Sequence, residues 1–110
     1  MRRLTLSAPL YDPDFIDRIY GCALGAAAGD ALGMPLEFGP RLSPDKILFE
    51  MIDGPLPAGA FTDDTEMALA LCESLIEGNG FTAVNTMKAF YQWFLSNPRD
   101  VGIQTSAVMK

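Results

Sequence analysis

The sequence predicts an all-α fold, because its apolar residues recur at helical spacing in three segments and nowhere alternate over more than a few residues. The apolar residues at this spacing lie within 15–31, 67–75 and 84–94. Turn-forming residues separate them, and each is preceded by a residue that can cap a helix. With 49% hydrophobic and 20% charged residues among 110, the composition is that of a folded domain with a real core.

The first helix is expected to begin at Asp12-Pro13, an acidic N-cap followed by proline at the first helical position. Residues 1–11 before it are expected to form an irregular arm. Within the helix, glycines recur at four-residue intervals, at Gly21, Gly25, Gly29 and Gly33. Each interior glycine costs about 1 kcal/mol relative to alanine. We therefore expect another backbone to approach closely and this helix to be packed tightly in a helical core.

The loop after this helix contains Glu37, a charge between apolar neighbours just past a glycine and a proline. One interpretation is a solvated loop residue, the usual fate of a lone glutamate. The other is a carboxylate presented into a cleft, where catalytic groups concentrate. Asp30, near the end of the helix, is expected to accept hydrogen bonds from nearby backbone N–H groups.

An acidic junction joins a loop rich in glycine and proline to the second helix. Asp63, with Glu66 three residues later, has the form of a capping box. The alternative for Thr62, Asp63 and Asp64 is a site for a hard cation, because Mg²⁺, Mn²⁺ and Ca²⁺ take oxygen ligands. The spacing alone favours the helix cap. Gly78 is placed for a left-handed C-terminal cap.

Thr82 is expected to cap the third helix, and Ser96-Asn97-Pro98 to stop it. Its aromatic side chains are expected in the core: Phe90, Tyr91, Trp93 and Phe94. A short helix is expected over 45–51, a loop over 100–105, and the beginning of a further helix over 106–110. No capping pattern closes that last helix, so the chain looks cut.

The formal net charge is −6 and there is no histidine, which constrains the chemistry. An acidic chain argues against nucleic-acid binding, and any catalysis is expected to depend on carboxylates. Cys22 and Cys72 are expected as reduced thiols in the core. No apolar run approaches the roughly 18 residues of a membrane span. No secretory core is present either, so we expect a cytoplasmic protein that binds no membrane.

Three segments, in this order and spacing, resemble the ADP-ribosylglycohydrolase family, the group that contains the hydrolase that reactivates dinitrogen reductase. They are Gly21 to Phe38 (GCALGAAAGDALGMPLEF), Phe61 to Thr65 (FTDDT) and Asp100 to Thr105 (DVGIQT). The resemblance covers 15–110. It implies a multi-helical all-α fold that is incomplete in this chain, with 12–110 as the N-terminal part of the domain.

The resemblance also implies a hydrolase that cleaves the glycosidic bond between ADP-ribose and a protein side chain or small acceptor. Its cofactors would be two divalent cations, Mg²⁺ or Mn²⁺, which orient ribose hydroxyls and polarise a water while a carboxylate moves the proton. Carried over by position, the site residues are the metal ligands Thr62, Asp63 and Asp64, the catalytic carboxylates Glu37 and Asp100, and the ADP-ribose contacts Gly102, Ile103 and Thr105.

The chain departs from the family pattern in one respect. The remaining metal ligands of the family come from an Asp-x-Asp-Thr motif, and none follows Asp64 here. Because Mg²⁺ demands a nearly complete octahedral shell, the chain alone is expected to be inactive and poorly stable, with exposed apolar faces on the central helix. It is either a partial hydrolase, which a second polypeptide could complete, or a non-catalytic structural or ADP-ribose-binding relative. The combination of Thr62-Asp63-Asp64 with Glu37 and Asp100 favours the enzyme lineage.

Overall fold

The computed structural model describes residues 12–110, which form helices and no strand. This confirms the predicted all-α fold. The elements are α1 (Pro13–Gly33), the 3-10 helices η2 (Met34–Leu36) and η3 (Pro44–Lys46), and then α2 (Asp63–Glu77), α3 (Ala83–Leu95) and α4 (Ile103–Met109). The arm expected over 1–11 lies outside the described residues.

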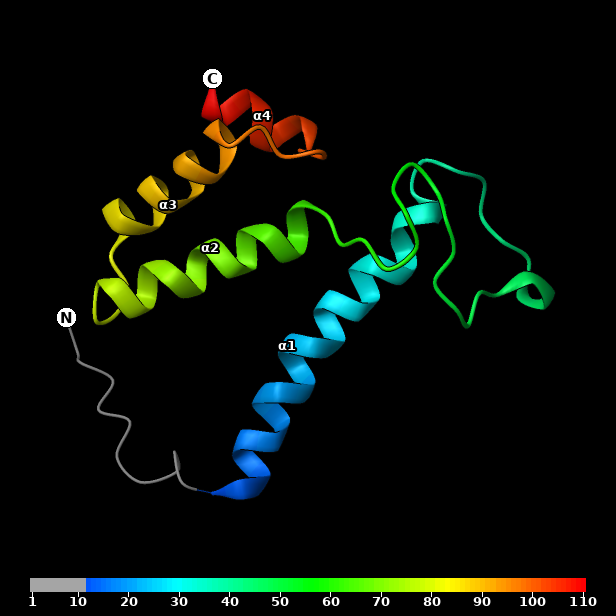
Figure 1. Cartoon of the computed structure of the whole chain (residues 1–110), viewed down its shortest axis with the longest axis horizontal. Coiled ribbons are helices and arrows are strands. Elements are labelled where there is room, and N and C mark those ends of the chain that lie inside the picture. Colours follow the sequence, from blue (N-terminus) through cyan, green and yellow to red (C-terminus); the bar gives the residue numbers. More distant parts are fainter. Residues whose placement is uncertain (1–11) are drawn as a thin grey trace.

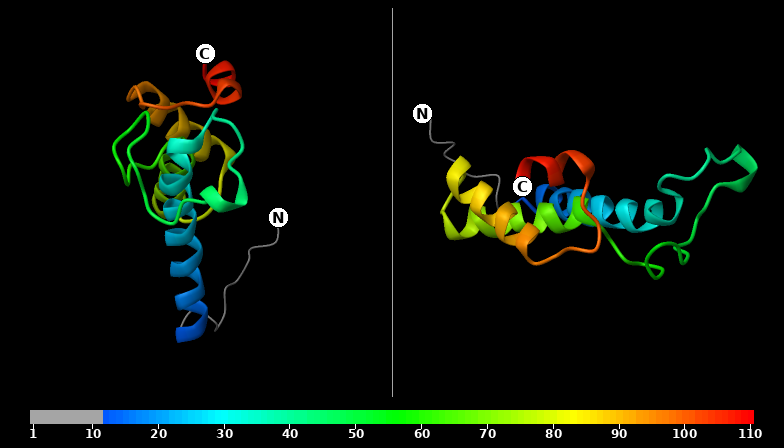
Figure 2. Two further views of the ribbon diagram at one scale, coloured as in Figure 1. Left: turned by 90° about the vertical axis from the view of Figure 1, so that its right-hand side faces the viewer. Right: turned by 90° about the horizontal axis from the view of Figure 1, so that it is seen from above.

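The helices form a pair with a third helix leading away from it. α2 and α3 lie side by side and α4 returns over the C-terminal end of α3, whereas α1 approaches the others chiefly at the N-terminal end of α2 (Figure 1). The N-terminal half of α1 projects from the rest, as the side view in Figure 2 shows. The segment 37–62, which includes η3, links η2 to α2. The end of α1 and the start of α2 lie close together, because Thr62 and Thr65 donate hydrogen bonds to Asp30.

The predicted N-caps of α1 and α3 are confirmed. Asp12 accepts a hydrogen bond from the Asp14 N–H at 3.0 Å, and the Thr82 hydroxyl accepts one from the Asn85 N–H at 3.2 Å. Each cap satisfies an N–H group that has no partner inside its helix. The stop after α3 is also confirmed, because Asn97, with φ 61°, turns the chain out of the helix.

Three local predictions are wrong by a few residues. Gly78 is right-handed (φ −81°), and the left-handed residue is Asn79 (φ 49°), because asparagine tolerates that conformation and the reversal falls one residue later. The helix expected over 45–51 is limited to η3, since the chain is already extended at Ile47. The loop expected over 100–105 ends at Gly102, where α4 begins.

The core is small and lies at the helix contacts. Its buried apolar residues are Ala31, Met34 and Ala70, and its buried polar residues are Thr62, Ser74 and Thr86. Ser74, on α2, donates to the Leu71 carbonyl at 2.8 Å and lies 3.4 Å from the Thr86 hydroxyl of α3. Small residues at this contact let α2 and α3 approach, and their hydroxyl groups remain hydrogen-bonded.

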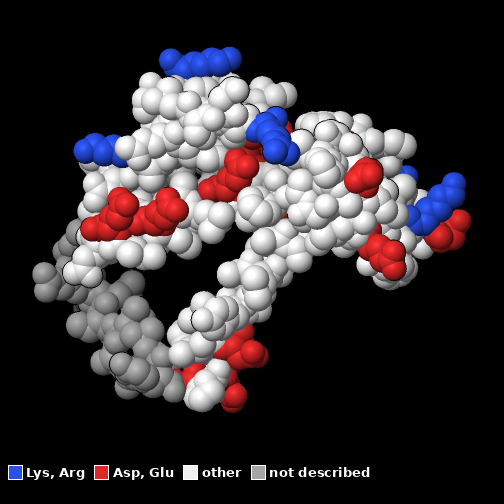
Figure 3. Space-filling model, in the orientation of Figure 1, with Lys and Arg blue, Asp and Glu red and all other residues white. Residues whose placement is uncertain are grey.

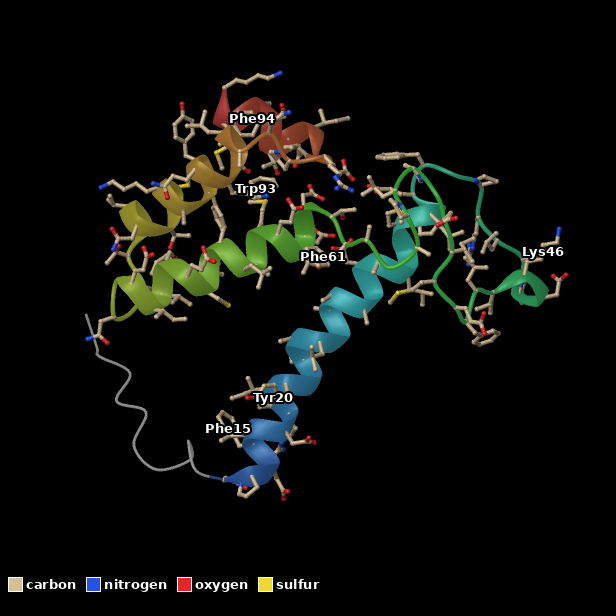
Figure 4. The ribbon with its side chains drawn as sticks, in the orientation of Figure 1. Phe15, Tyr20, Lys46, Phe61, Trp93 and Phe94 are labelled. Carbon is tan, nitrogen blue, oxygen red and sulfur yellow. The ribbon has the colours of Figure 1, made fainter. Side chains whose placement is uncertain are left out.

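The glycine face of α1 is open, so the predicted close approach of another backbone is wrong for the described residues. A Cβ atom added at Gly21, Gly25, Gly29 or Gly33 would meet nothing within 4 Å. Tyr20 and Leu24 are 64% and 67% exposed, which agrees with the expected apolar exposure of this helix. Tyr20 projects from α1 with no other helix against it (Figure 4).

Two further burial predictions are wrong in part. Cys22 and Cys72 are exposed free thiols rather than core residues. On α3, Phe90, Trp93 and Phe94 are half-buried, as an amphipathic helix requires, but Tyr91 is exposed. Cys22 lies on the part of α1 that projects away from the other described helices. Cys72 lies on an exposed face of α2, and Tyr91 on an exposed face of α3.

The surface of the described residues is acidic along α2. In Figure 3, Asp and Glu side chains gather over this helix and at the N-terminal end of α1, while Lys and Arg side chains are scattered singly. Among residues 12–110, no helix combines the length and the apolar composition that crossing a membrane requires.

Candidate functional site

Three segments far apart in the sequence line one hollow: the loop after α1, the start of α2 and the loop into α4. Its volume is about 420 Å³. Its lining includes these residues predicted from the resemblance: Glu37, Asp63, Asp64, Asp100, Gly102, Ile103 and Thr105. The tertiary structure therefore brings together carboxylates that the sequence separates by tens of residues.

Thr62, the remaining predicted site residue, is buried next to this hollow with 5% of its surface exposed. It lines a second hollow of about 620 Å³ beside the end of α1. Glu37, Asp63 and Asp64 line both hollows, so they stand at the boundary between them.

A carboxylate from α1 holds the start of α2. Asp30 Oδ2 accepts hydrogen bonds from the Thr62 N–H at 2.8 Å, the Thr65 N–H at 3.2 Å and the Thr65 hydroxyl at 2.6 Å. Asp30 Oδ1 accepts one from the Thr62 hydroxyl at 2.6 Å. The N–H groups at a helix start lack partners within the helix, and here a distant residue satisfies two of them.

The predicted capping box is therefore wrong. α2 begins at Asp63 with Thr62 as the N-cap residue, and no side chain of its own first turn caps it. Because Asp30 accepts from the free N–H groups, the Glu66 carboxylate is available elsewhere, and it accepts a hydrogen bond from Trp93 Nε1 at 2.6 Å. Trp93 projects from α3 toward α2 (Figure 4), so this bond ties the two helices together.

The same hydrogen bonds set the charge state of Asp30. Partial burial acts to raise the pKa of this carboxyl, but the hydrogen bonds from the Thr62 and Thr65 side chains and backbone outweigh it and hold the pKa below its ordinary value of 3.8. Asp30 is therefore a carboxylate at neutral pH and can only accept hydrogen bonds.

The sequence pattern assigned Asp30 only local hydrogen bonds, and its role as the cap of α2 was missed. A signal was available: Asp30 lies in the last turn of α1, where the helix dipole disfavours negative charge. An acidic residue at that place needs donors from elsewhere in the fold.

Phe38 was not singled out from the sequence as a residue that lines the hollow. It has φ 61°, lines the hollow after Glu37 and is 92% exposed.

Asp63 joins the start of α2 to the loop before α4. Its Oδ2 accepts a hydrogen bond from the Gly102 N–H at 2.8 Å. A Cβ atom on Gly102 would lie 3.4 Å from this oxygen, which is an ordinary van der Waals contact. The bond fixes the relative positions of Gly102 and Asp63.

The carboxylates around the hollow repel one another. The pKa of Glu37 is raised by partial removal from water and by the negative charges of Asp100, Asp63, Asp64 and Asp30, in that order. Glu37 thus binds a proton more tightly in the folded chain than in the unfolded one. Protonation of Glu37 therefore stabilises the folded chain. This stabilisation is fully present below the ordinary pKa of 4.5 and is lost as the pH rises through the pKa of the folded chain.

We expect a carbon-13 NMR titration to show the pKa of the Glu37 carboxyl above 4.5. Asp100→Asn should move it back toward 4.5, because Asp100 is the strongest of the neighbouring charges. Asp53→Asn is the control, since Asp53 accepts the Ala58 N–H within the 53–58 loop and is not among those charges. Equal shifts in the two variants would show that the effect is general surface charge rather than the arrangement of this site.

The oxygen donors fit part of a cation shell. The Thr62 hydroxyl donates its hydrogen to Asp30, so the lone pairs of the Thr62 oxygen remain available to a cation. Asp63 keeps one oxygen unbonded, and no hydrogen bond within residues 12–110 reaches Asp64. These are the hard oxygen ligands that Mg²⁺ and Mn²⁺ prefer. Within the same residues, however, no three acidic or thiol side chains converge to hold a metal ion.

Comparison with known proteins identifies several relatives of this chain. The chain is 40% identical over 96 residues to the ADP-ribosyl-[dinitrogen reductase] glycohydrolase of Rhodospirillum rubrum, a match over 82% of this chain and 33% of that protein. It is 38% identical over 82 residues to the ADP-ribosylarginine hydrolase Tri1 of Pseudomonas putida, over 72% of this chain and 22% of that protein. It is also 39% identical over 94 residues to an uncharacterized protein of Archaeoglobus fulgidus, over 78% of this chain and 30% of that protein.

The chain thus spans a third or less of the length of these relatives. The family model for ADP-ribosylglycohydrolase matches residues 11–110, nearly the whole of it. The matched part contains all the residues that line the two hollows. This chain belongs to the ADP-ribosylglycohydrolase family.

Proposed function

We propose that residues 12–110 form the N-terminal part of a hydrolase domain that cleaves the glycosidic bond between ADP-ribose and a protein side chain or small acceptor. The observation that supports this most directly is the meeting of Glu37, Asp63, Asp64 and Asp100 at one hollow. Carboxylates held near one another suit both cation binding and proton transfer. Two relatives are named for ADP-ribosylated dinitrogen reductase and ADP-ribosylarginine, which favours an ADP-ribosylated protein as the substrate.

Thr62, Asp63 and Asp64 are proposed to hold part of the shell of two divalent cations, Mg²⁺ or Mn²⁺. Such ions, when bound, orient ribose hydroxyls and make a water more acidic. Ligands from outside residues 12–110, from the same polypeptide or a second one, would complete the shell. The hydrogen bond from Gly102 to Asp63 keeps one carboxylate oxygen directed toward the loop before α4, which leaves the other for an ion.

Asp100 is proposed as the general base that takes the proton from the attacking water. The raised pKa of Glu37 favours a carboxyl that can hold or release a proton at the edge of the same hollow. An oxocarbenium-like transition state is stabilised by nearby negative charge. Gly102, Ile103 and Thr105 line the hollow beside these groups, where they are proposed to contact ADP-ribose.

A second candidate is a non-catalytic protein that binds ADP-ribose. The incomplete ligand set within residues 12–110 favours it, since a site without its full shell holds ions weakly. The two functions differ in whether ADP-ribose binding requires the cation.

The test is calorimetric titration of Mn²⁺, and then of ADP-ribose, into the chain and into Asp63→Ala/Asp64→Ala. We expect the double substitution to weaken Mn²⁺ binding about tenfold or more, since losing a group that only supports a metal ligand already costs that much. We expect ADP-ribose to bind only with Mn²⁺ present. The matched control is Glu73→Ala/Glu77→Ala, which removes two exposed carboxylates from the other end of α2.

Equal loss of Mn²⁺ binding in both double variants would mean that the ion is attracted by acidic surface alone, and the metal site would be rejected. ADP-ribose binding that needs no cation and survives Asp63→Ala/Asp64→Ala would support the non-catalytic alternative. Circular dichroism of each variant checks that the helices are retained.

A further inference from the structure

The two oxygens of Asp30 have different partners. Oδ2 accepts both backbone N–H groups and the Thr65 hydroxyl, whereas Oδ1 accepts only the Thr62 hydroxyl. The donors are 32 and 35 residues away in sequence, so this is a tertiary contact rather than a local cap. It joins the last turn of α1 to the first turn of α2.

The contact fixes the direction of the Thr62 hydroxyl. A hydroxyl group has one donor and two acceptor lone pairs, and a carboxylate has no hydrogen to give. The Thr62 hydrogen must therefore point at Asp30 Oδ1, 2.6 Å away, and the lone pairs remain unused. Thr62 is 5% exposed, so few waters compete for this arrangement.

We propose that Asp30 is a positioning residue for the cation site: it turns the Thr62 hydroxyl so that its lone pairs are available to the ion, and it holds the turn that presents Asp63 and Asp64. The first part rests on the proposed function of Thr62 as a ligand. Asp30 itself lines the hollow of about 620 Å³ that Thr62, Asp63 and Asp64 also line.

A purely structural cap and a positioning residue make different predictions for Asp30→Asn. The asparagine oxygen can replace Oδ2 and keep the three bonds from Thr62 N–H, Thr65 N–H and the Thr65 hydroxyl. Its NH₂ group then replaces Oδ1 and donates to the Thr62 oxygen, which reverses the direction of that hydrogen bond and occupies a lone pair. The cap survives, but the Thr62 oxygen has one lone pair fewer for a cation, and its hydrogen is no longer held on Asp30.

The experiment compares the full chain with Asp30→Asn, Asp30→Ala and the control Asp12→Asn, which changes the same residue type at an ordinary local cap. Amide hydrogen exchange at Thr62 and Thr65 is measured without metal, and Mn²⁺ affinity by calorimetry. We expect Asp30→Ala to speed exchange at both amides and to weaken Mn²⁺ binding, each about tenfold or more. Asp30→Asn should leave exchange nearly unchanged and still weaken Mn²⁺ binding about tenfold. Asp12→Asn should change neither.

Thr65→Val provides a variant that leaves Asp30 and the proposed ligands intact. It removes one donor to Oδ2, so exchange at Thr65 should increase while Mn²⁺ affinity falls less than in Asp30→Asn. Thr65→Ser, which restores the hydroxyl, should return exchange toward the wild-type rate.

Mn²⁺ affinity in Asp30→Asn equal to that of the wild type would overturn the positioning role and leave only a helix cap. Unchanged exchange in Asp30→Ala would overturn the contact itself. A wild-type chain that binds no Mn²⁺ rejects the metal site of the proposed function and, with it, the effect of Asp30 on the ligand. This outcome is distinct from loss confined to the Asp30 variants.

Discussion

Met34→Ala is expected to lower the free energy of unfolding by about 2–5 kcal/mol, the range for removing a buried large side chain. Met34 is 4% exposed and is one of the few buried apolar residues of the described chain. It begins η2, between Asp30 and Glu37, so its side chain anchors the segment that presents both carboxylates. Urea denaturation followed by circular dichroism measures the effect, since the described structure is helical.

The control is Met51→Ala, in which the same side chain is removed from a residue that is 41% exposed. Its expected cost is within about 0.5 kcal/mol, as for ordinary surface positions. A similar loss of stability in the two variants would contradict the placement of Met34 in the core. The difference matters for the site, because a chain with so few buried apolar residues has little stability to lose.

Gly54→Ala is expected to lower the free energy of unfolding by about 1–3 kcal/mol, as overpacking does. An added Cβ would lie 2.6 Å from Pro35 Cα and 2.9 Å from Pro35 Cβ. The first of these is a backbone atom, so no side-chain rotation relieves the clash, and the loop must move away from η2. Urea denaturation measures the cost, and NMR shifts of the Glu37 amide report displacement of the neighbouring segment.

Gly25→Ala is the matched control for the same chemical change. Apart from the neighbouring residues and backbone of α1 itself, no atom lies within 4 Å of the added methyl group, and alanine favours a helix interior over glycine by about 1 kcal/mol. The variant should therefore be more stable than the wild type. A destabilising Gly25→Ala would show that the glycine face of α1 is covered in solution.

Both predictions concern the junction of α1, η2 and the loop that precedes α2. This junction determines the distance between Glu37 on one side and Asp63 and Asp64 on the other, which line the same hollows. Few buried apolar side chains stabilise this junction, and hydrogen bonds from Thr62 and Thr65 to Asp30 also join α1 to the start of α2. Small changes there should affect the site more than equal changes in the α2–α3 pair.

The sequence by itself determined the helices and several of their ends. Helical periodicity predicted α1, α2 and α3, and the N-caps at Asp12 and Thr82 were predicted from single residues. These features depend on groups within about one turn of each other, so the local sequence contains the necessary information. The resemblance of three short segments added the family, which the match over 11–110 confirms.

Only the tertiary structure decided which partner each carboxylate takes. Asp63 and Glu66 have the spacing of a local cap, yet they bind Gly102 and Trp93, while Asp30 caps α2 from another helix. A carboxylate accepts hydrogen bonds from whichever donor lies near it. These partners are 27 to 39 positions apart in the sequence, so the path of the whole chain decides which of them come close. For the same reason the pattern of glycines in α1 could indicate a close contact but could not show that the described residues leave that face open.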